Sequence, residues 1–326
     1  MNIAAFDIGT NSIHMLVAEI KPDLSFEVLE HEKDTTRLGD GSFESHHLNQ
    51  AAFQRALEVI DQFHKVAKAY HVKKYLAIAT SAVRDARNGR KFVQEVYRRT
   101  GIRIKIVSGD EEGRLIELAA RSNMPVRGKK TLVVDIGGGS MELILGDGKK
   151  YYFLKSFKLG VTRLTDRFLS KDPPSRKQLK RLEKHIEKTL GKAVKKIRKW
   201  RVSAVIGTAG TMINLGSMVY ERESARPLKL VHHYDMERRK LEEVHKELIS
   251  LPLRKRLNYP GLDSKRADII VAGSVLVRTL MLLLRIDRIT ISKKGIREGI
   301  LLDFIENNRS SLLKGRSGKI PLRKQK

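Results

Sequence analysis

Apolar positions alternate on both sides of a short polar stretch near the start of the chain. The residues before Asp7 and after Ser12 read as two β-strands, and Gly9, Thr10 and Asn11 supply turn chemistry between them. The pattern therefore predicts a β-hairpin. Its turn would direct backbone N–H groups and two small hydroxyls at one place, which suits an anion such as phosphate, although an ordinary hairpin explains the segment equally well.

The same pattern returns in the middle of the chain. Residues 131–148, TLVVDIGGGSMELILGDG, again run strand, Asp-Ile-Gly, small polar turn, strand. Asp7 and Asp135 lie 135 − 7 = 128 positions apart, so the chain divides into two related halves that each open with a phosphate-type hairpin. Two such hairpins in register favour the phosphate interpretation over simple strand punctuation.

Helical and strand-like periods alternate between and after the hairpins. Residues 45–72 repeat apolar side chains at helical spacing, and residues 102–120 change from strand to turn to helix. Residues 171–201 combine one apolar face with a face of lysines and arginines. The apolar run 269–284 is shorter than the ~20 residues of a membrane span and contains Arg278, so it is expected to be a core helix. The alternation predicts an α/β protein with ligands between its domains.

Chain length and composition limit the architecture. With 326 residues, and a prior of roughly 150 residues per domain, two domains are expected. We place them at residues 1–124 and 125–305, with a basic C-terminal tail at 306–326. The chain has no cysteine, which excludes disulfides, zinc–thiolate sites and a catalytic thiol. No secretion signal is evident, so a cytoplasmic location without membrane association is expected.

Charge is the strongest compositional anomaly. The chain has 65 Lys plus Arg against 37 Asp plus Glu, a formal net charge of +28. Such a field attracts polyanions without selecting among nucleic acid, nucleotides and a phosphate polymer. Aromatic residues make up only 6% of the chain, and the basic stretches show no aromatic interleaving, so nucleic acid is not expected to be the main partner.

Seven motifs in order give a closer resemblance. FDIGTNSIHMLVAEI, ATSAVRDARN, SGDEEGRL, VVDIGGGSMEL, VIGTAGTM, PGLDSKRADIIVAG and GIREGIL resemble the exopolyphosphatase and guanosine pentaphosphate phosphohydrolase family from Asn2 to about Asp303. The resemblance implies two actin-like (ribonuclease H-like) domains with an interdomain cleft. It also implies magnesium-dependent removal of the terminal phosphate from inorganic polyphosphate or guanosine pentaphosphate.

The chemistry of phosphoanhydride cleavage indicates which residue types the active site needs. The reaction needs a positioned water, a base for its proton and positive charge on the phosphoryl oxygens. SGDEEGRL offers Asp110, Glu111 and Glu112, and the family pattern places the general base on Glu112. Acidic residues in a first helical turn also simply stabilise the helix dipole, which is the structural alternative.

Oxygen ligands and phosphate donors come from the turns. Asp7, Asp135 and Glu142 are the candidate ligands of Mg²⁺ or another divalent cation, which prefers hard oxygens; a turn Asp that only binds its own backbone is the alternative. Phosphate donors without side-chain bulk are expected from three turns. They comprise Asn11, Ser12, Gly137, Gly138, Gly139, Ser140, Gly207, Thr208, Gly210 and Thr211.

Two arginines complete the candidate set. Arg84 carries a guanidinium that can bond two phosphate oxygens at once, or it can form a salt bridge with Asp85 or another neighbour. Arg266 and Asp268 are expected to tie a helix start together. A kinase or ATPase of the same fold and a non-enzymatic polyanion or RNA binder remain alternative functions, and a homodimer is a further expectation.

Overall fold

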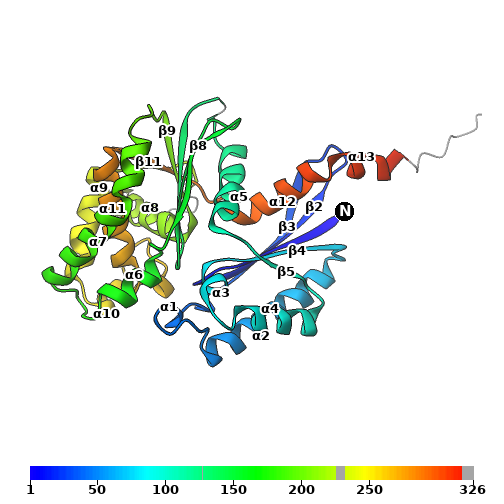
Figure 1. Ribbon diagram of the computed structural model, residues 1–326, viewed down its shortest axis with the longest axis horizontal. Coiled ribbons are helices and arrows are strands. Elements are labelled where there is room, and N and C mark those ends of the chain that lie inside the picture. Colours follow the sequence, from blue (N-terminus) through cyan, green and yellow to red (C-terminus); the bar gives the residue numbers. More distant parts are fainter. Residues whose placement is uncertain (127, 225–231, 318–326) are drawn as a thin grey trace, which may run out of the picture.

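The computed structural model describes residues 1–126, 128–224 and 232–317 and contains two β-sheets flanked by helices (Figure 1). The first sheet has the order β3-β2-β1-β4-β5. Its strands are β1 (Asn2–Ile8), β2 (Ile13–Ile20), β3 (Phe26–Asp34), β4 (Lys74–Ala79) and β5 (Ile104–Ile106). β1, β2 and β3 form an antiparallel meander, whereas β4 and β5 add in parallel to β1.

The second sheet repeats this plan. Its order is β10-β11-β9-β6-β7-β8, so the meander β6-β7-β8 and the parallel additions β9 and β11 match the first sheet, with β10 added antiparallel at the edge. The strands are β6 (Thr131–Ile136), β7 (Met141–Gly146), β8 (Tyr151–Phe157), β9 (Ala204–Thr208), β10 (Asp235–Glu237) and β11 (Arg288–Ile291). The repeat predicted from the two hairpins is therefore present in the folded chain.

Helices pack their apolar faces against both sheets. The first sheet is accompanied by α1 (Ser42–Ser45), α2 (Gln50–Ala69), α3 (Ser81–Asp85) and α4 (Gly89–Thr100). The second is accompanied by α6 (Val161–Phe168), α7 (Arg176–Ile197), α8 (Ala209–Ser224), α9 (Arg238–Ser250), α10 (Leu253–Arg256), the 3₁₀ turn η1 (Ser264–Arg266) and α11 (Ile270–Leu284). The predicted helices at 45–72, 171–201 and 269–284 are confirmed as α2, α7 and α11, each with most of the expected apolar residues buried.

Two helices are exchanged relative to the expected sequence division. α5 (Gly109–Ser122), expected in the first domain, packs on β6, β7 and β8, while α12 (Ile296–Asn307), expected in the second, packs on β1 and β2. Ile300 and Leu301 of α12 bury against Ile3 and Ala5, which explains the exchange: these apolar residues have their partners on the first sheet. α5 and α12 also pack against each other between the two sheets (Figure 1).

The C-terminal segment begins in regular structure. α13 (Arg309–Ser317) continues as a helix beyond α12, so the tail predicted at 306–326 begins in regular structure. Residues 318–326 of that prediction lie outside the described residues. No helix within residues 1–126, 128–224 and 232–317 combines the length and apolar character needed to cross a bilayer.

Candidate active site

Both predicted hairpins form, and their turns have the same geometry. The N–H of Gly9 donates to the carbonyl of Ser12 at 3.1 Å, and the N–H of Gly137 donates to the carbonyl of Ser140 at 3.1 Å. In the first hairpin Asp7 lies opposite His14, and in the second Asp135 lies opposite Glu142. Each aspartate therefore sits one residue before the end of a strand, immediately ahead of a tight turn.

The two turns meet across the interface between the sheets. A Cβ atom added to Gly139 would lie 2.5 Å from the Ser81 hydroxyl and 2.7 Å from that of Thr10. At Gly138 the same atom would lie 2.9 Å from the Thr10 methyl carbon. Real side chains do not approach so closely, so the second turn has room here only because it consists of glycines. The tip of one hairpin thus packs against the tip of the other.

This approach gathers four acidic side chains from both halves. Burial and, to a smaller extent, the charge of Glu112 raise the pKa of Asp7 to about 7. Burial is also the main cause that raises the pKa of Asp135 well above its usual value, with contributions from Glu112 and Asp7. The pKa of Glu142 is raised by burial and then by Glu112 and Asp135. Like charges that influence one another in a buried place are typical of functional sites.

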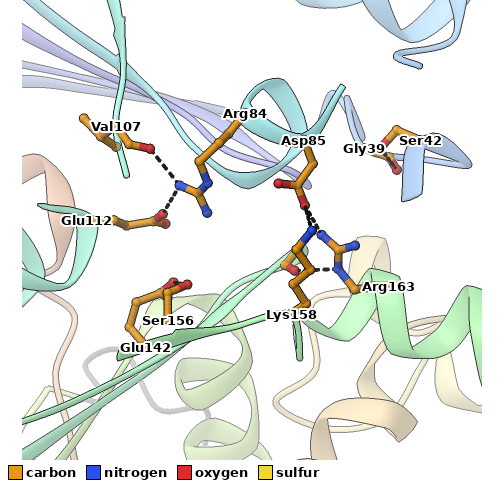
Figure 2. Close-up of polar contacts among 11 residues, drawn as sticks. Gly39, Ser42, Arg84, Asp85, Val107, Glu112, Glu142, Ser156, Lys158 and Arg163 are labelled. Carbon is orange, nitrogen blue, oxygen red and sulfur yellow. Dashed lines mark hydrogen bonds and ion pairs between the residues drawn. The ribbon is translucent and has the colours of Figure 1, made fainter. Parts of the chain in front are cut away.

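Glu112 differs from its acidic neighbours in its surroundings. Ser108 caps α5 by accepting a hydrogen bond from the N–H of Glu111, Glu111 pairs with Lys105 at 2.5 Å, and Asp110 is exposed. Glu112 is 7% exposed and receives a hydrogen bond of 2.9 Å from Arg84, which also donates to the Val107 carbonyl (Figure 2). Burial raises the pKa of Glu112 while the Arg84 guanidinium opposes that shift.

Arg84 forms one of the salt bridges that the sequence allowed, and its expected contact with phosphate stays a prediction. Its salt-bridge partner is Glu112 rather than Asp85, because α3 carries Arg84 toward the start of α5 (Figure 2). Asp85 instead bonds Arg163 of α6 at 2.5 Å and lies 3.6 Å from Lys158. The Arg163 Nε also donates to the Gly139 carbonyl at 2.9 Å, so this arginine ties the second turn to the first half of the chain.

Part of the donor set fits a hard cation. The Glu142 Oε1 atom accepts a hydrogen bond from Ser156, but its buried Oε2 atom has no hydrogen-bond partner among the residues that the structure describes. A carboxylate oxygen left in this way is costly unless a cation or donor reaches it. Within the described ranges, no three acidic or imidazole side chains form a cage on their own. Magnesium binds through one or two carboxylates plus waters and phosphate oxygens, so Asp7, Asp135 and Glu142 suit that ion without forming a closed cage.

The remaining predicted phosphate donors fall into two groups. Asn11, Ser12 and Ser140 are buried in the two turns, and Thr208 lies beside Asp135 in the sheet register. Gly207 has a packing role, because a Cβ there would lie 2.8 Å from Ile289. Gly210 and Thr211 open α8 after Ala209, a residue with a φ of 68°. A Cβ atom at Gly210 would collide with the guanidinium of Arg266, which packs against this helix start.

The expected tie between Arg266 and Asp268 is wrong. Asp268 bonds Arg37 of the first half at 2.6 and 3.1 Å, because the segment after η1 faces the loop that precedes α1. Sequence reasoning also missed Arg163, Lys158 and Arg297. The buried Nη1 atom of Arg297 has no partner, and its charge lowers the pKa of Asp7 against the stronger effect of burial. Arg297 belonged to the quoted motif GIREGIL, which was the available signal.

A cavity of about 310 Å³ opens beside the acidic cluster. Its lining comes from α3, the start of α5, the second turn and β8, and it includes Arg84, Ser140, Ser156 and Lys158. A larger cavity of about 610 Å³ lies elsewhere on the second half, around Trp200 and Arg288, and holds none of the predicted site residues. The smaller cavity is lined by two side chains that bond members of the acidic cluster, Arg84 to Glu112 and Ser156 to Glu142, although none of the four carboxylates lines it.

Two sheets with the same strand plan, paired Asp-Ile-Gly turns and a buried acid cluster between them define an actin-like α/β fold. A family model described as the Ppx/GppA phosphatase family matches residues 16–308. The chain belongs to this family and is a phosphoanhydride hydrolase.

Individual relatives agree along nearly the whole chain. Exopolyphosphatase 1 of Mycobacterium leprae is 27% identical over 308 residues, covering 94% of this chain and 90% of that protein. Exopolyphosphatase 2 of Mycobacterium tuberculosis is 28% identical over 314 residues, covering 93% and 98%. A crystal structure of an exopolyphosphatase from Cytophaga hutchinsonii superposes with a TM-score of 0.88 at 27% identity, covering 94% and 98%. The predicted family and fold are confirmed.

Proposed function

We propose that this protein is an exopolyphosphatase that releases the terminal orthophosphate of inorganic polyphosphate. The observation that carries the proposal is the buried crevice that Asp7, Glu112, Asp135 and Glu142 form where the two halves meet. Carboxylates from both halves surround one buried place, Glu112 is held there by Arg84, and two glycine-containing turns supply backbone donors. The names of the relatives and the net charge of +28 support a polymeric phosphate substrate.

Glu112 is the proposed general base. It would accept a proton from water while the water oxygen attacks the terminal phosphorus and the P–O bond to the rest of the chain breaks, which yields orthophosphate and a polymer shorter by one unit. Burial raises the pKa of Glu112, and the charge and hydrogen bond of Arg84 oppose that shift by favouring the ionised form that a base requires. Arg84 uses its Nη1 atom for Glu112 and Val107, so its other N–H groups can donate to the phosphoryl oxygens.

Asp7, Asp135 and Glu142 would hold the divalent cation, for which we propose Mg²⁺. The ion neutralises charge on the phosphoryl oxygens when bound. The residues of this chain keep the surrounding crevice closed: Gly138 and Gly139 allow the turns to meet, and Arg163 holds the second turn against α3. A hydrolase must hold a water beside its base whereas a kinase must exclude water, and Glu112 is the residue proposed to hold that water.

Substitution of the base tests the proposal. Glu112→Gln keeps the side-chain shape and is expected to lower the rate of phosphate release from polyphosphate by on the order of 10²–10⁴ while leaving binding largely intact. Glu111→Gln, one residue earlier and paired with Lys105 at the surface, is the matched control and should stay near the wild-type rate. Undiminished turnover by Glu112→Gln would remove Glu112 from the mechanism.

The substrate range needs a parallel assay. Wild-type protein is supplied with polyphosphate, guanosine pentaphosphate or ATP, each with and without magnesium, and free orthophosphate is measured. Release from polyphosphate that stops with a chelator supports the proposal. Release from ATP alone, or phosphate transfer to an acceptor without free orthophosphate, would favour the kinase or ATPase alternative. Guanosine pentaphosphate hydrolysis, a homodimer and a cytoplasmic location stay predictions.

A further inference from the structure

The solvent-facing side of α7 carries a continuous row of cations. Leu182, Ile186 and Leu190 are buried and fix which side of the helix faces the core. Six exposed cations spaced by three or four residues run along the opposite side, and we call them the α7 stripe: Lys177, Arg181, Lys184, Lys188, Lys192 and Lys195. With a rise of 1.5 Å per residue, the stripe is about 27 Å long.

The stripe is not neutralised by the protein. In the part of the chain that the structure describes, none of its six members has a carboxylate within ion-pair distance. Other surface helices behave differently, since Lys65 pairs with Asp61 on α2 and Arg238 pairs with Glu242 on α9. Like charges four residues apart destabilise a helix, so α7 forms through its buried face and its Ser175 cap in spite of the stripe. Helix stability therefore does not explain the row.

A succession of cations connects the stripe to the crevice. Arg84 lies at the acidic cluster, Arg163 follows on the first turns of α6, and Arg167 lies near the end of α6 (Figures 1 and 2). The Phe168 ring next to Arg167 contacts the His185 ring of α7 with centroids 4.9 Å apart. Burial lowers the pKa of Arg163, Asp85 opposes that shift, and Arg84 and then Arg167 add to it.

The same field reaches α7. Burial lowers the pKa of His185, and the positive charges of Arg167 and Lys188 lower it further. Arg167 thus acts electrostatically on both Arg163 and His185, and Lys188 of the stripe acts on the same histidine. Positively charged side chains therefore extend from Arg163 beside the crevice, through Arg167 of α6, to Lys188 in the middle of the α7 stripe.

We propose that the α7 stripe is an exosite for long-chain polyphosphate, which holds a distal part of the polymer while the terminal phosphate occupies the crevice. This inference rests on the proposed function. A linear polymer with one or more negative charges per unit matches a linear row of cations, and release of its counterions drives such binding. Retention on α7 keeps a shortened chain near the crevice after each cleavage.

Composition of the stripe favours polyphosphate over RNA. Five of the six cations are lysines, which bind phosphate as point charges without the planar geometry that reads base edges. Single-stranded nucleic acids bind by stacking bases on exposed aromatic rings, and the stripe contains none. Trp200 lies beyond the end of α7, where its ring already packs against Tyr152 and beneath Lys130. The geometry supplies charge without base recognition.

A matched pair of charge variants tests the exosite. The stripe variant replaces Lys184, Lys188, Lys192 and Lys195 by Gln. The control variant replaces four exposed lysines of the first half, Lys68, Lys73, Lys74 and Lys91, by Gln and removes the same total charge. Glutamine is a good helix former, so both variants are expected to fold, and circular dichroism checks this. Each protein is assayed with long-chain polyphosphate and with tripolyphosphate at several salt concentrations.

The stripe variant is expected to lose on the order of 10-fold in kcat/KM for the long chain, mostly through KM, and to keep its activity on tripolyphosphate. Its slope of log binding constant against log salt for the long chain should be shallower by about 3, as for four lost phosphate contacts. The control variant should change both substrates equally and slightly. An unchanged ratio of long-chain to tripolyphosphate activity in the stripe variant would overturn the exosite.

Two further results separate the proposals. If wild-type protein releases phosphate from neither polymer, the proposed function fails, and the exosite fails with it. A fluorescent oligoribonucleotide supplies the other arm. If the stripe variant loses binding of this probe but retains long-chain polyphosphate, α7 is a nucleic-acid surface and the exosite proposal is wrong.

Discussion

The two hairpins share a backbone and differ in their chemistry. Both turns close with an N–H to carbonyl bond of 3.1 Å, and both place an aspartate one residue before the strand end. Opposite that aspartate, however, the first hairpin has His14 and the second has Glu142. The pKa of His14 is lowered well below its usual value by burial and by Arg297, whereas that of Glu142 is raised by burial and by Glu112.

The turn tips and their anchors complete the comparison. The first tip carries Thr10, and the second is bare at Gly138 and Gly139, so one fits against the other. Each turn also has its own arginine. The N–H of Arg37 bonds the Asn11 carbonyl while its guanidinium reaches Asp268 of the other half, and Arg163 bonds the second turn and reaches Asp85. A duplicated motif thus became asymmetric: one copy neutral beside its aspartate, the other acidic and more deeply anchored.

The largest difference in activity is expected between substitutions of the two residues that lie opposite the aspartates, Glu142 and His14. Glu142→Gln is expected to reduce kcat by about 10²-fold or more, because it removes a buried carboxylate with an unpartnered oxygen beside Asp135. His14→Gln replaces a neutral imidazole and should cost less than about 10-fold. Rates measured over a magnesium series should show a higher requirement only for Glu142→Gln. Equal losses would mean that the two positions are equivalent.

The arginine anchors should rank next. Arg163→Lys cannot bond both the Gly139 carbonyl and Asp85, so we expect about a 10-fold loss in kcat/KM. Arg37→Lys affects a more exposed anchor, with 34% of the side chain accessible against 14% for Arg163, and should cost only a few-fold. Steady-state kinetics on polyphosphate compares them. A larger loss for Arg37→Lys would reverse the asserted asymmetry.

The glycine tip gives a stability test within one turn. Gly139→Ala would place a Cβ within 2.7 Å of three atoms of the first half and should lower the free energy of unfolding by about 1–3 kcal/mol. Gly137→Ala meets only the Ser140 carbonyl at 3.6 Å and should change it by less than about 0.5 kcal/mol. Urea denaturation measures both. Equal urea midpoints for the two variants would show that the two turns are not in close contact in solution.

The smallest expected effect concerns a buried histidine in the core behind the second hairpin rather than a residue of the crevice. Burial, followed by Arg278, lowers the pKa of His245 from 6.5 to about 4, and its Nδ1 atom lies 3.0 Å from the Ser274 hydroxyl. The unfolded chain therefore binds this proton first as the pH falls below 6.5, so stability is lost toward pH 4. Between pH 7 and 4.5, wild-type protein should lose on the order of 1 kcal/mol more than His245→Gln. Parallel denaturation curves at both pH values for the two proteins would contradict this.

Much of the fold follows from local patterns. The hairpins, α2, α7 and α11 each depend on turn residues or on apolar periodicity within a few residues, and these predictions are confirmed. Asp7, Asp135 and Glu142 were found because they stand beside recognisable turns, whereas Glu112 was singled out from its acidic neighbours only by the resemblance to the family. Arg163 could not be identified from the sequence, because nothing around it distinguishes it from the other cations of a strongly basic chain.

The sequence by itself determined the duplicated strand–turn–strand units, the helical periods and the positions of Asp7, Glu112 and Asp135, because short-range backbone preferences and side-chain spacing specify them. Only the tertiary structure decided that α5 and α12 cross to the opposite sheets, that Arg84 pairs with Glu112, and that the two tips interlock. Those outcomes depend on which buried surfaces and charges meet across long separations, and close packing with mutual electrostatics settles them only once the whole chain is folded.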